Sequence, residues 1–289
     1  MPSEDLTPAM DVLGLVAGGG GLPIEIARAC EASGRPVFVV RLAGMASPEL
    51  ARYPGAEVGL AELGRCVKAL RAAGCGRVTF AGEVRRPDFA ALKPDLRALK
   101  YLPAIIAAAR KGDDALLRSV LGVFETEGFA VESARDAAGG LILPAGPFGR
   151  RRPGRGHLAD IAAAMQAARA IGRLDIGQAA VVCDGIVLAV EAQEGTDALL
   201  TRCAELPQPL RGSRRRRRGV LAKAPKPGQD RRVDLPTIGA RTVEQAAAAG
   251  LAGIAGEAGG LLVVDGHAVR AAADRLGLFV IGVEEGPTS

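Results

Sequence analysis

The stretch VLGLVAGGGGLPIEIARACEASGRPVFVVRL, residues 12–42, decides the fold of the first half of the chain. Residues 12–17 form an unbroken apolar run, which is typical of a strand buried on both faces of a parallel sheet. Four glycines follow, and then Pro23, which suits the first turn of a helix that Gly34 ends. Residues 36–42 predict a second strand. The order strand, helix, strand predicts parallel pairing with a right-handed crossover.

The same alternation continues toward residue 140. Residues 60–74 have helical spacing, and residues 77–82 and 128–134 predict further strands, with helical sequence between those two strands. Residues 10–140 are therefore predicted to form a Rossmann-like α/β domain. The polar stretch over residues 1–9 lacks an apolar core segment, so it is predicted to be a disordered extension and not a signal peptide.

The second half predicts a different sheet. Residues 141–156 are rich in Pro, Gly and Arg and predict an interdomain linker. Residues 157–289 alternate helices with strands, and Asp184-Gly185 between two apolar runs is a strong hairpin signal. We therefore expect a C-terminal mixed α/β domain that carries the catalytic residues.

Composition restricts the function. The chain has 289 residues and a formal net charge of +5, but only 3% aromatic residues and no Trp. Low aromatic content argues against a nucleic-acid partner that stacks bases. Arg150–Arg155 and Arg214–Arg218 are dense in arginine, which favours an anionic membrane surface or lipid head group, with a solubilising face as the alternative. Five isolated cysteines and two histidines disfavour a zinc site and fit a reducing cytosol.

The glycine run lies between a strand and a helix, where backbone N–H groups and the helix N-terminus favour an anion. The predicted substrate contacts in this run are Gly18, Gly19, Gly20 and Gly21. A dinucleotide-binding motif is disfavoured, because Pro23 replaces its third glycine and Arg41 stands where an acidic residue would hold a ribose. A tight turn without a ligand is the alternative.

Arg85 and Arg86 follow the end of the strand at 77–82. Open α/β sheets place ligands at the carboxyl ends of their strands, so these two arginines are candidates for binding a substrate phosphate. The alternative is a turn whose arginines face solvent.

The segment LAKAPKPGQDRRVDLPTIG, residues 221–239, mixes cations with carboxylates. Cations bind phosphate and carboxylates bind a divalent metal, so this mixture suits metal-assisted chemistry on a phosphate anhydride. The alternative is a solvated loop with surface ion pairs. The predicted metal ligands for Mg²⁺ combine two aspartates of the segment with two acidic residues beyond a hairpin strand: Asp230, Asp234, Glu191 and Asp197.

With these motifs in hand, the chain resembles the LpxI family of UDP-2,3-diacylglucosamine pyrophosphatases. The resemblance rests on segments spread along nearly the whole chain: AGGGGLP (17–23), AGEVRRPDF (81–89), GDDALLR (112–118), IGRLDIGQAAVV (171–182), EAQEGTDALLTR (191–202) and LAKAPKPGQDRRVDLPTIGARTV (221–243). The last two are the most specific.

The resemblance implies Mg²⁺-dependent hydrolysis of UDP-2,3-diacylglucosamine to UMP and lipid X, a step of lipid A biosynthesis. It also implies two domains with the lipid held between them, and Asp234 matches the essential acidic residue of the family. The predicted catalytic residues are Asp234, Asp230 and Lys223. The predicted substrate contacts in the same segment are Lys226, Arg231 and Thr237.

The implied setting is the cytoplasm, with peripheral attachment to the anionic cytoplasmic face of the inner membrane. A homodimer is compatible with this prediction. Two other classes of function stay open at this stage. One is a nucleotide-dependent oxidoreductase, which the missing acidic residue disfavours, and the other is a non-catalytic protein that binds a nucleotide or an anionic lipid.

Overall fold

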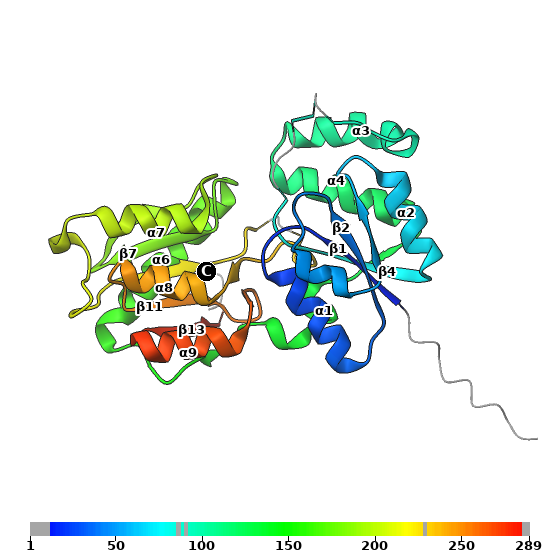
Figure 1. Ribbon diagram of the computed structural model, residues 1–289. Helices are drawn as coiled ribbons and strands as arrows, with labels where there is room; N and C mark the ends of the chain where they lie inside the picture. Colours follow the sequence, from blue (N-terminus) through cyan, green and yellow to red (C-terminus); the bar gives the residue numbers. More distant parts are fainter. Residues whose placement is uncertain (1–11, 85–87, 90–91, 228–229, 285–289) are drawn as a thin grey trace, which may run out of the picture. The chain divides into compact units, whose positions relative to one another are not determined.

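The computed structural model describes residues 12–84, 88–89, 92–227 and 230–284. The chain divides into two compact units, Met1–Gly140 and Leu141–Ser289, and each is described by itself (Figure 1). The predicted extension over residues 1–9 lies outside the described residues.

The first unit contains a five-stranded parallel sheet in the order β3-β2-β1-β4-β5. Its strands are β1 (Val12–Ala17), β2 (Val37–Leu42), β3 (Gly55–Val58), β4 (Cys75–Ala81) and β5 (Ala130–Val131). Its helices are α1 (Leu22–Ser33), α2 (Leu63–Ala72), α3 (Leu96–Ala109), α4 (Asp113–Thr126) and the single turn α5 (Ala134–Ala137). The predicted Rossmann-like parallel sheet is confirmed.

Helices cover both faces of this sheet. Val16 of β1 joins residues of α2 and α4, such as Leu70 and Phe124, in one buried cluster. Side chains alternate along a strand, so Leu13 and Leu15 face the opposite side, and α1 packs against these strands. Burial on both faces explains why β1 is apolar throughout.

The second unit contains a six-stranded mixed sheet in the order β6-β13-β11-β9-β7-β8. Its strands are β6 (Gly146–Pro147), β7 (Ala179–Cys183), β8 (Ile186–Val190), β9 (Val220–Lys223), β11 (Gly253–Glu257) and β13 (Phe279–Val283), and β10 (Thr237–Ile238) pairs with β12 (Leu262–Val263) separately. Its helices are α6 (Arg155–Arg173), α7 (Gly195–Glu205), α8 (Ala240–Ala248) and α9 (Gly266–Leu276). The predicted mixed α/β domain and the hairpin at Asp184-Gly185 are both present.

The two faces of this sheet are covered by two separate hydrophobic clusters. Alternate strand residues such as Val181 and Leu221 pack against α7, α8 and α9. Their neighbours Val182 and Val220 pack against α6 on the other face. Strands β9, β11 and β13 run parallel, so their carboxyl ends share one edge of the sheet.

Residues 141–156, predicted as an interdomain linker, make contacts within the second unit. Strand β6 pairs with β13, and Leu143 is fully buried in the core of that unit. The N–H group of Leu143 donates to the carbonyl of Leu261 at 2.8 Å. Helix α6 begins at Arg155, within the predicted linker.

Strand β11, whose sequence is GIAGE, has no counterpart among the predicted strands. Its two glycines give it the composition of a loop, but both are required by packing. A Cβ atom at Gly253 would lie 2.4 Å from the ring of Phe279, and one at Gly256 would lie 2.3 Å from Leu261. The strand is therefore central because its backbone can approach its neighbours closely.

Among the helices of the described residues, none is both long and apolar enough to span a bilayer.

Candidate functional site

The candidate site is centred on Lys223, the last residue of β9. It lies at the carboxyl edge of the parallel strands, beside Gly256 of β11 in the strand register. Its side chain is only 5% exposed, and its ammonium group donates to the hydroxyl of Thr196 at 2.8 Å and to the carbonyl of Thr237 at 3.1 Å. A buried cation is unfavourable unless polar groups surround it, and these two oxygen atoms supply such groups. The ammonium group therefore has a defined position at the sheet edge where open α/β sheets bind ligands.

Thr196 connects Lys223 to a second buried charge. The Thr196 hydroxyl donates to Oε1 of Glu191 at 2.5 Å, and Oε2 of Glu191 accepts from the backbone N–H of Gln178 at 3.0 Å. Glu191 is also 5% exposed. A hydroxyl that accepts from an ammonium and donates to a carboxylate has its proton fixed in one direction. The network therefore sets the position of the Lys223 ammonium group.

The role of Thr196 is not evident from sequence, where its position at the start of a helix predicts an N-cap. The N-cap residue of α7 is instead Glu194, and the Thr196 hydroxyl serves Glu191 and Lys223. Glu191 was predicted as a metal ligand, and the described contacts place it in this hydrogen-bond network. Thr196 stands five residues after Glu191 in the sequence, and nothing there marks it as a partner of Lys223.

A second buried carboxylate lies at the same edge of the sheet. Glu257 ends β11, and it pairs with Arg169 of α6 at 3.3 Å and with Arg231 at 3.1 Å. Arg231 was predicted to contact substrate, and its half-exposed side chain is anchored by Glu257. Neither Glu257 nor Arg169 was predicted as a site residue, because the strand that carries Glu257 was not recognised.

Two further charged residues of the 221–239 segment form ion pairs within the second unit. Lys226 pairs with Asp175 at 2.7 Å. Asp230 forms an ion pair with Arg232 at 2.7 Å, and its carbonyl accepts from the N–H group of Asp234 at 3.0 Å. Asp230 thus organises a turn, and the partly buried Asp234 follows it.

The predicted magnesium ligands do not form a cluster. Asp197 of α7 pairs with Arg241 at 3.0 Å, Glu191 contacts Thr196, and Asp230 contacts Arg232. Within residues 12–84, 88–89, 92–227 and 230–284, no group of three or more His, Cys, Asp or Glu side chains is arranged to hold a metal ion. The described contacts therefore do not bring the four predicted ligands, Asp230, Asp234, Glu191 and Asp197, into one group, and their role as metal ligands stays a prediction.

In the first unit, the glycine run crosses the strand end at Gly82-Glu83. The N–H groups of Gly18 and Gly19 donate to the carbonyls of Ala81 and Glu83 at 2.9 and 2.8 Å. A Cβ atom at Gly18 would lie 2.6 Å from the Glu83 carbonyl oxygen. The chain crossing thus requires a glycine at Gly18, whereas a Cβ atom at Gly19 would lie no closer than 3.4 Å to its neighbours.

Gly20 and Gly21 lie beyond this crossing. Gly20 has a φ of +83° with open space beside it, and Gly21 is the N-cap residue of α1. The structure does not test the predicted substrate contacts of the glycine run, so they stay a prediction. Arg85 and Arg86 lie outside the described residues.

Comparison with known proteins bears on the family. The model of the LpxI N-terminal domain matches residues 12–141, and the model of the LpxI C-terminal domain matches residues 144–281. The UDP-2,3-diacylglucosamine pyrophosphatase LpxI of Caulobacter vibrioides is 63% identical over 275 residues, which cover 95% of this chain and 98% of that protein. Among solved structures, CobK precorrin-6A reductase aligns with 97% of this chain and 90% of its own at 12% identity and a TM-score of 0.34, too weak to carry an argument.

These findings correct the predicted function, which joined magnesium-dependent hydrolysis to a non-catalytic alternative. The relative is named as a pyrophosphatase, so a non-catalytic nucleotide-binding or lipid-binding protein is not favoured. Neither its name nor the family descriptions include a magnesium requirement. The comparisons therefore do not support a magnesium requirement, and Mg²⁺ as a cofactor stays an untested prediction.

Both family models together cover nearly the whole chain, and a relative of 63% identity matches 95% of it. The chain therefore belongs to the LpxI family.

Proposed function

We propose that this protein hydrolyses the pyrophosphate bond of UDP-2,3-diacylglucosamine. Water adds to one phosphorus as the bridging oxygen leaves with the other phosphate, so the products are UMP and 2,3-diacylglucosamine 1-phosphate, lipid X. The support for the substrate is the activity for which the relative of 63% identity is named. The single observation that carries the chemistry is the buried network of Lys223, Thr196 and Glu191 at the carboxyl edge of the sheet.

In this proposal the cations neutralise the charge of the pyrophosphate. A pyrophosphate repels an attacking water through its own negative charge, and more charge develops on the leaving phosphate in the transition state. Lys223 and Arg231 each present a positive charge whose position a buried glutamate fixes. Positioned charge in a partly buried site stabilises a transition state more than mobile charge in water.

The carboxylates of the segment have the complementary role. Asp234 activates the attacking water, and Asp230 holds the turn that presents it. Thr237 contributes its carbonyl to the ammonium group of Lys223. Lys226 contributes a further contact to the substrate.

The test is UMP release from UDP-2,3-diacylglucosamine in detergent micelles. Lys223→Met should lower kcat about a hundredfold or more, the usual cost of removing one stabilising group at a developing charge. Thr196→Val should lower kcat with a smaller change in KM, because it frees Lys223 from its fixed position. Thr201→Val is the matched control, since this exposed hydroxyl in the same helix donates to the carbonyl of Asp197 and lies outside the network.

Three results would change the proposal. Absence of UMP release under every condition would remove the pyrophosphatase activity. Normal turnover by Lys223→Met would retain the activity and move the site away from this network. Asp234→Asn with normal turnover would remove Asp234 from the mechanism alone.

We also propose that the protein meets an anionic membrane surface peripherally, since the proposed substrate is a diacylated lipid. The arginine clusters were predicted to make this contact. In the second of them, Arg217 donates to the Ala247 carbonyl and Arg218 pairs with Asp184, so only part of that cluster faces solvent. A homodimer stays a prediction.

A further inference from the structure

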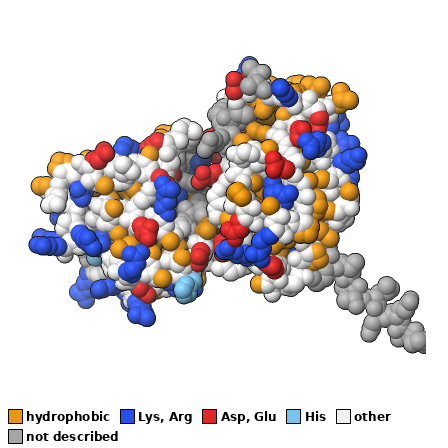
Figure 2. Space-filling model, in the orientation of Figure 1, with side chains coloured by type: hydrophobic (Ala, Val, Ile, Leu, Met, Phe, Trp, Pro, Cys, Tyr) orange, Lys and Arg blue, Asp and Glu red, His pale blue; other side chains and the backbone are white. Residues whose placement is uncertain are grey.

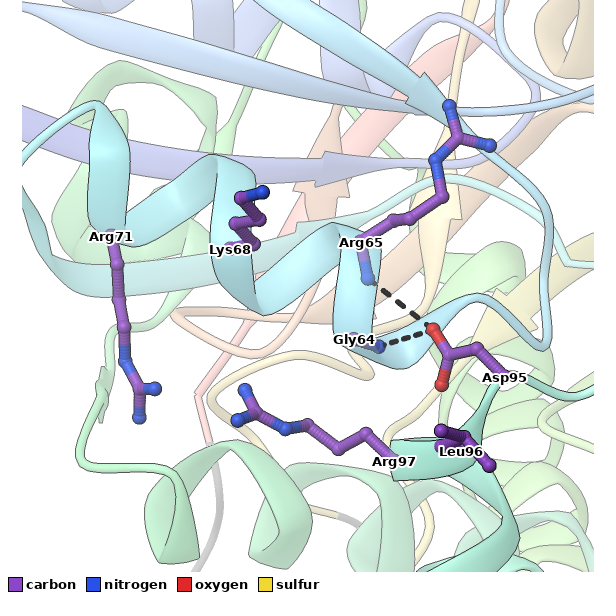
Figure 3. A pocket seen from close by; sticks show the side chains of 7 residues that line it. All are labelled: Gly64, Arg65, Lys68, Arg71, Asp95, Leu96 and Arg97. Carbon is purple, nitrogen blue, oxygen red and sulfur yellow. Dashed lines mark hydrogen bonds between the residues drawn. The ribbon is translucent and has the colours of Figure 1, made fainter.

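A hollow of about 560 Å³ lies on the first unit between α2 and the start of α3 (Figure 3). Four of the seven residues that line it are cationic: Arg65, Lys68, Arg71 and Arg97. The Lys68 side chain makes no hydrogen bond or ion pair with the residues that the structure describes. The only acidic residue of the lining is Asp95, and its carboxylate accepts hydrogen bonds from backbone N–H groups.

Asp95 fixes the geometry of this hollow. Its Oδ2 accepts from the N–H groups of Gly64 and Arg65 at the start of α2, at 2.6 and 3.3 Å. Its Oδ1 accepts from Ala98 at the start of α3, at 2.8 Å. One carboxylate therefore caps two helices, and its hydrogen bonds go to backbone N–H groups and not to the cations of the lining.

The arginines of the lining are held by acidic residues outside it. Arg65 pairs with Glu62, while Arg71 and Arg97 both pair with Glu127 at 3.2 and 3.4 Å. All three guanidinium side chains remain at least a third exposed. These pairs orient the guanidinium groups at the rim without covering them.

Apolar side chains stand next to these cations. Leu96, which lines the hollow, is 89% exposed, and Leu99 is 50% exposed. The two are three residues apart on α3, so they lie on one side of the helix, and exposed Pro103 continues that side. Apolar and basic side chains both face solvent over this part of the unit (Figure 2).

We propose that this surface, formed by Leu96 and Leu99 with the cations of the hollow, docks on an anionic lipid bilayer. An exposed leucine pair is unfavourable in water, and cations at its edge match the phosphates of lipid head groups. The leucines enter the interface while a head-group phosphate approaches Lys68 and the rim arginines. A protein partner is less favoured, because its surface would have to place carboxylates opposite Lys68 and the exposed guanidinium groups, whereas an anionic bilayer presents phosphates over its whole surface.

This inference rests on the proposed function only for the class of lipid, and its test needs no turnover. Binding is measured by sedimentation with sucrose-loaded vesicles of phosphatidylcholine, with and without phosphatidylglycerol. The full chain should prefer the anionic vesicles. Leu96→Glu with Leu99→Glu should weaken that binding at least tenfold, because both leucines leave the interface and two negative charges are added. Lys68→Glu should weaken it at low salt by about fivefold or more.

Two controls separate this surface from the predicted arginine clusters. Leu158→Glu replaces a 54% exposed leucine near the start of α6, beside the first cluster. Arg214→Glu with Arg215→Glu reverses exposed charges of the second cluster. Both controls should bind within twofold of the parent, with circular dichroism confirming that every variant is folded.

Several outcomes would overturn the proposal. These are equal binding of the parent to neutral and anionic vesicles, unchanged binding by the leucine variant, and an equal loss in the cluster controls. A change of molecular mass in solution by Leu96→Glu, without a change in vesicle binding, would assign the surface to a second copy of the chain.

Discussion

At the scale of single residues, the candidate site depends on charges that the fold buries and then fixes. Lys223 was expected from sequence, because lysines in a Pro-rich and Asp-containing segment suggest phosphate chemistry. Thr196 and Glu257 were not, because their importance comes from contacts with residues far along the chain. A hydroxyl near a helix start has the same appearance in sequence whether it caps the helix or bridges two buried charges.

The five cysteines give a prediction at this scale. All five are buried, and burial raises the pKa of the Cys66 thiol to about 12 and that of Cys203 to about 11. A raised pKa means that the thiolate is scarce at pH 8, so iodoacetamide should label these two sites far more slowly in the native protein than in urea. Mass spectrometry of the labelled peptides reads each site separately.

The sign of the pH effect follows from the same shift. The unfolded thiols ionise near their ordinary pKa, so the stability contributed by the neutral thiols should be intact below pH 8 and decline as pH rises toward the folded values. Rapid labelling of native Cys66 at pH 8 would contradict the burial of that side chain.

At the scale of elements, the sequence predicts well where a strand or helix carries its own periodicity. The strands at β1, β2 and β4 and the helices between them were predicted within a few residues. Strands β3 and β11 were missed because each contains glycine and has little apolar pattern. What makes them strands is the close approach of neighbouring chains, which sequence pattern does not record.

The chain crossing beside the glycine run gives a prediction for these elements. Gly82 has a φ of +92°, and an added Cβ atom would lie 2.4 Å from the carbonyl oxygen of Gly19. Gly82→Ala should lower stability by about 1–3 kcal/mol through this overlap, measured by thermal unfolding.

Gly122 provides the matched control for that substitution. It lies within α4, and an added Cβ atom would meet nothing within 4 Å. Gly122→Ala should leave stability unchanged or raise it by about 0.5–1 kcal/mol, because alanine favours a helix. Equal stability of the two variants would mean that the crossing tolerates a side chain.

At the scale of the whole molecule, the α/β class and the presence of two sheets of different type follow from the order of elements. The limits of the second unit do not. The segment before α6 has the composition of a linker, but two residues of strand and one buried leucine attach it to the sheet. Such a short strand forms through its tertiary contacts and has no periodic pattern in the sequence.

This attachment predicts how fragments of the second unit behave. A fragment of residues 141–284 should unfold cooperatively in urea. A fragment of residues 157–284 lacks β6 and Leu143, so it should be less stable by about 2–5 kcal/mol or more, the usual cost of emptying a buried leucine site. Equal unfolding midpoints would show that residues 141–156 contribute nothing to this unit.

Asp95, which caps both α2 and α3, has a consequence for the motion of the first unit. The amide protons of Gly64, Arg65 and Ala98 share one acceptor group, so the first turns of two helices are released by a single rotation of one side chain. Exchange of these amides with deuterium should therefore be correlated in time, although the helices are separate in sequence. The floor of the hollow and the leucines at its rim then loosen as one small opening unit.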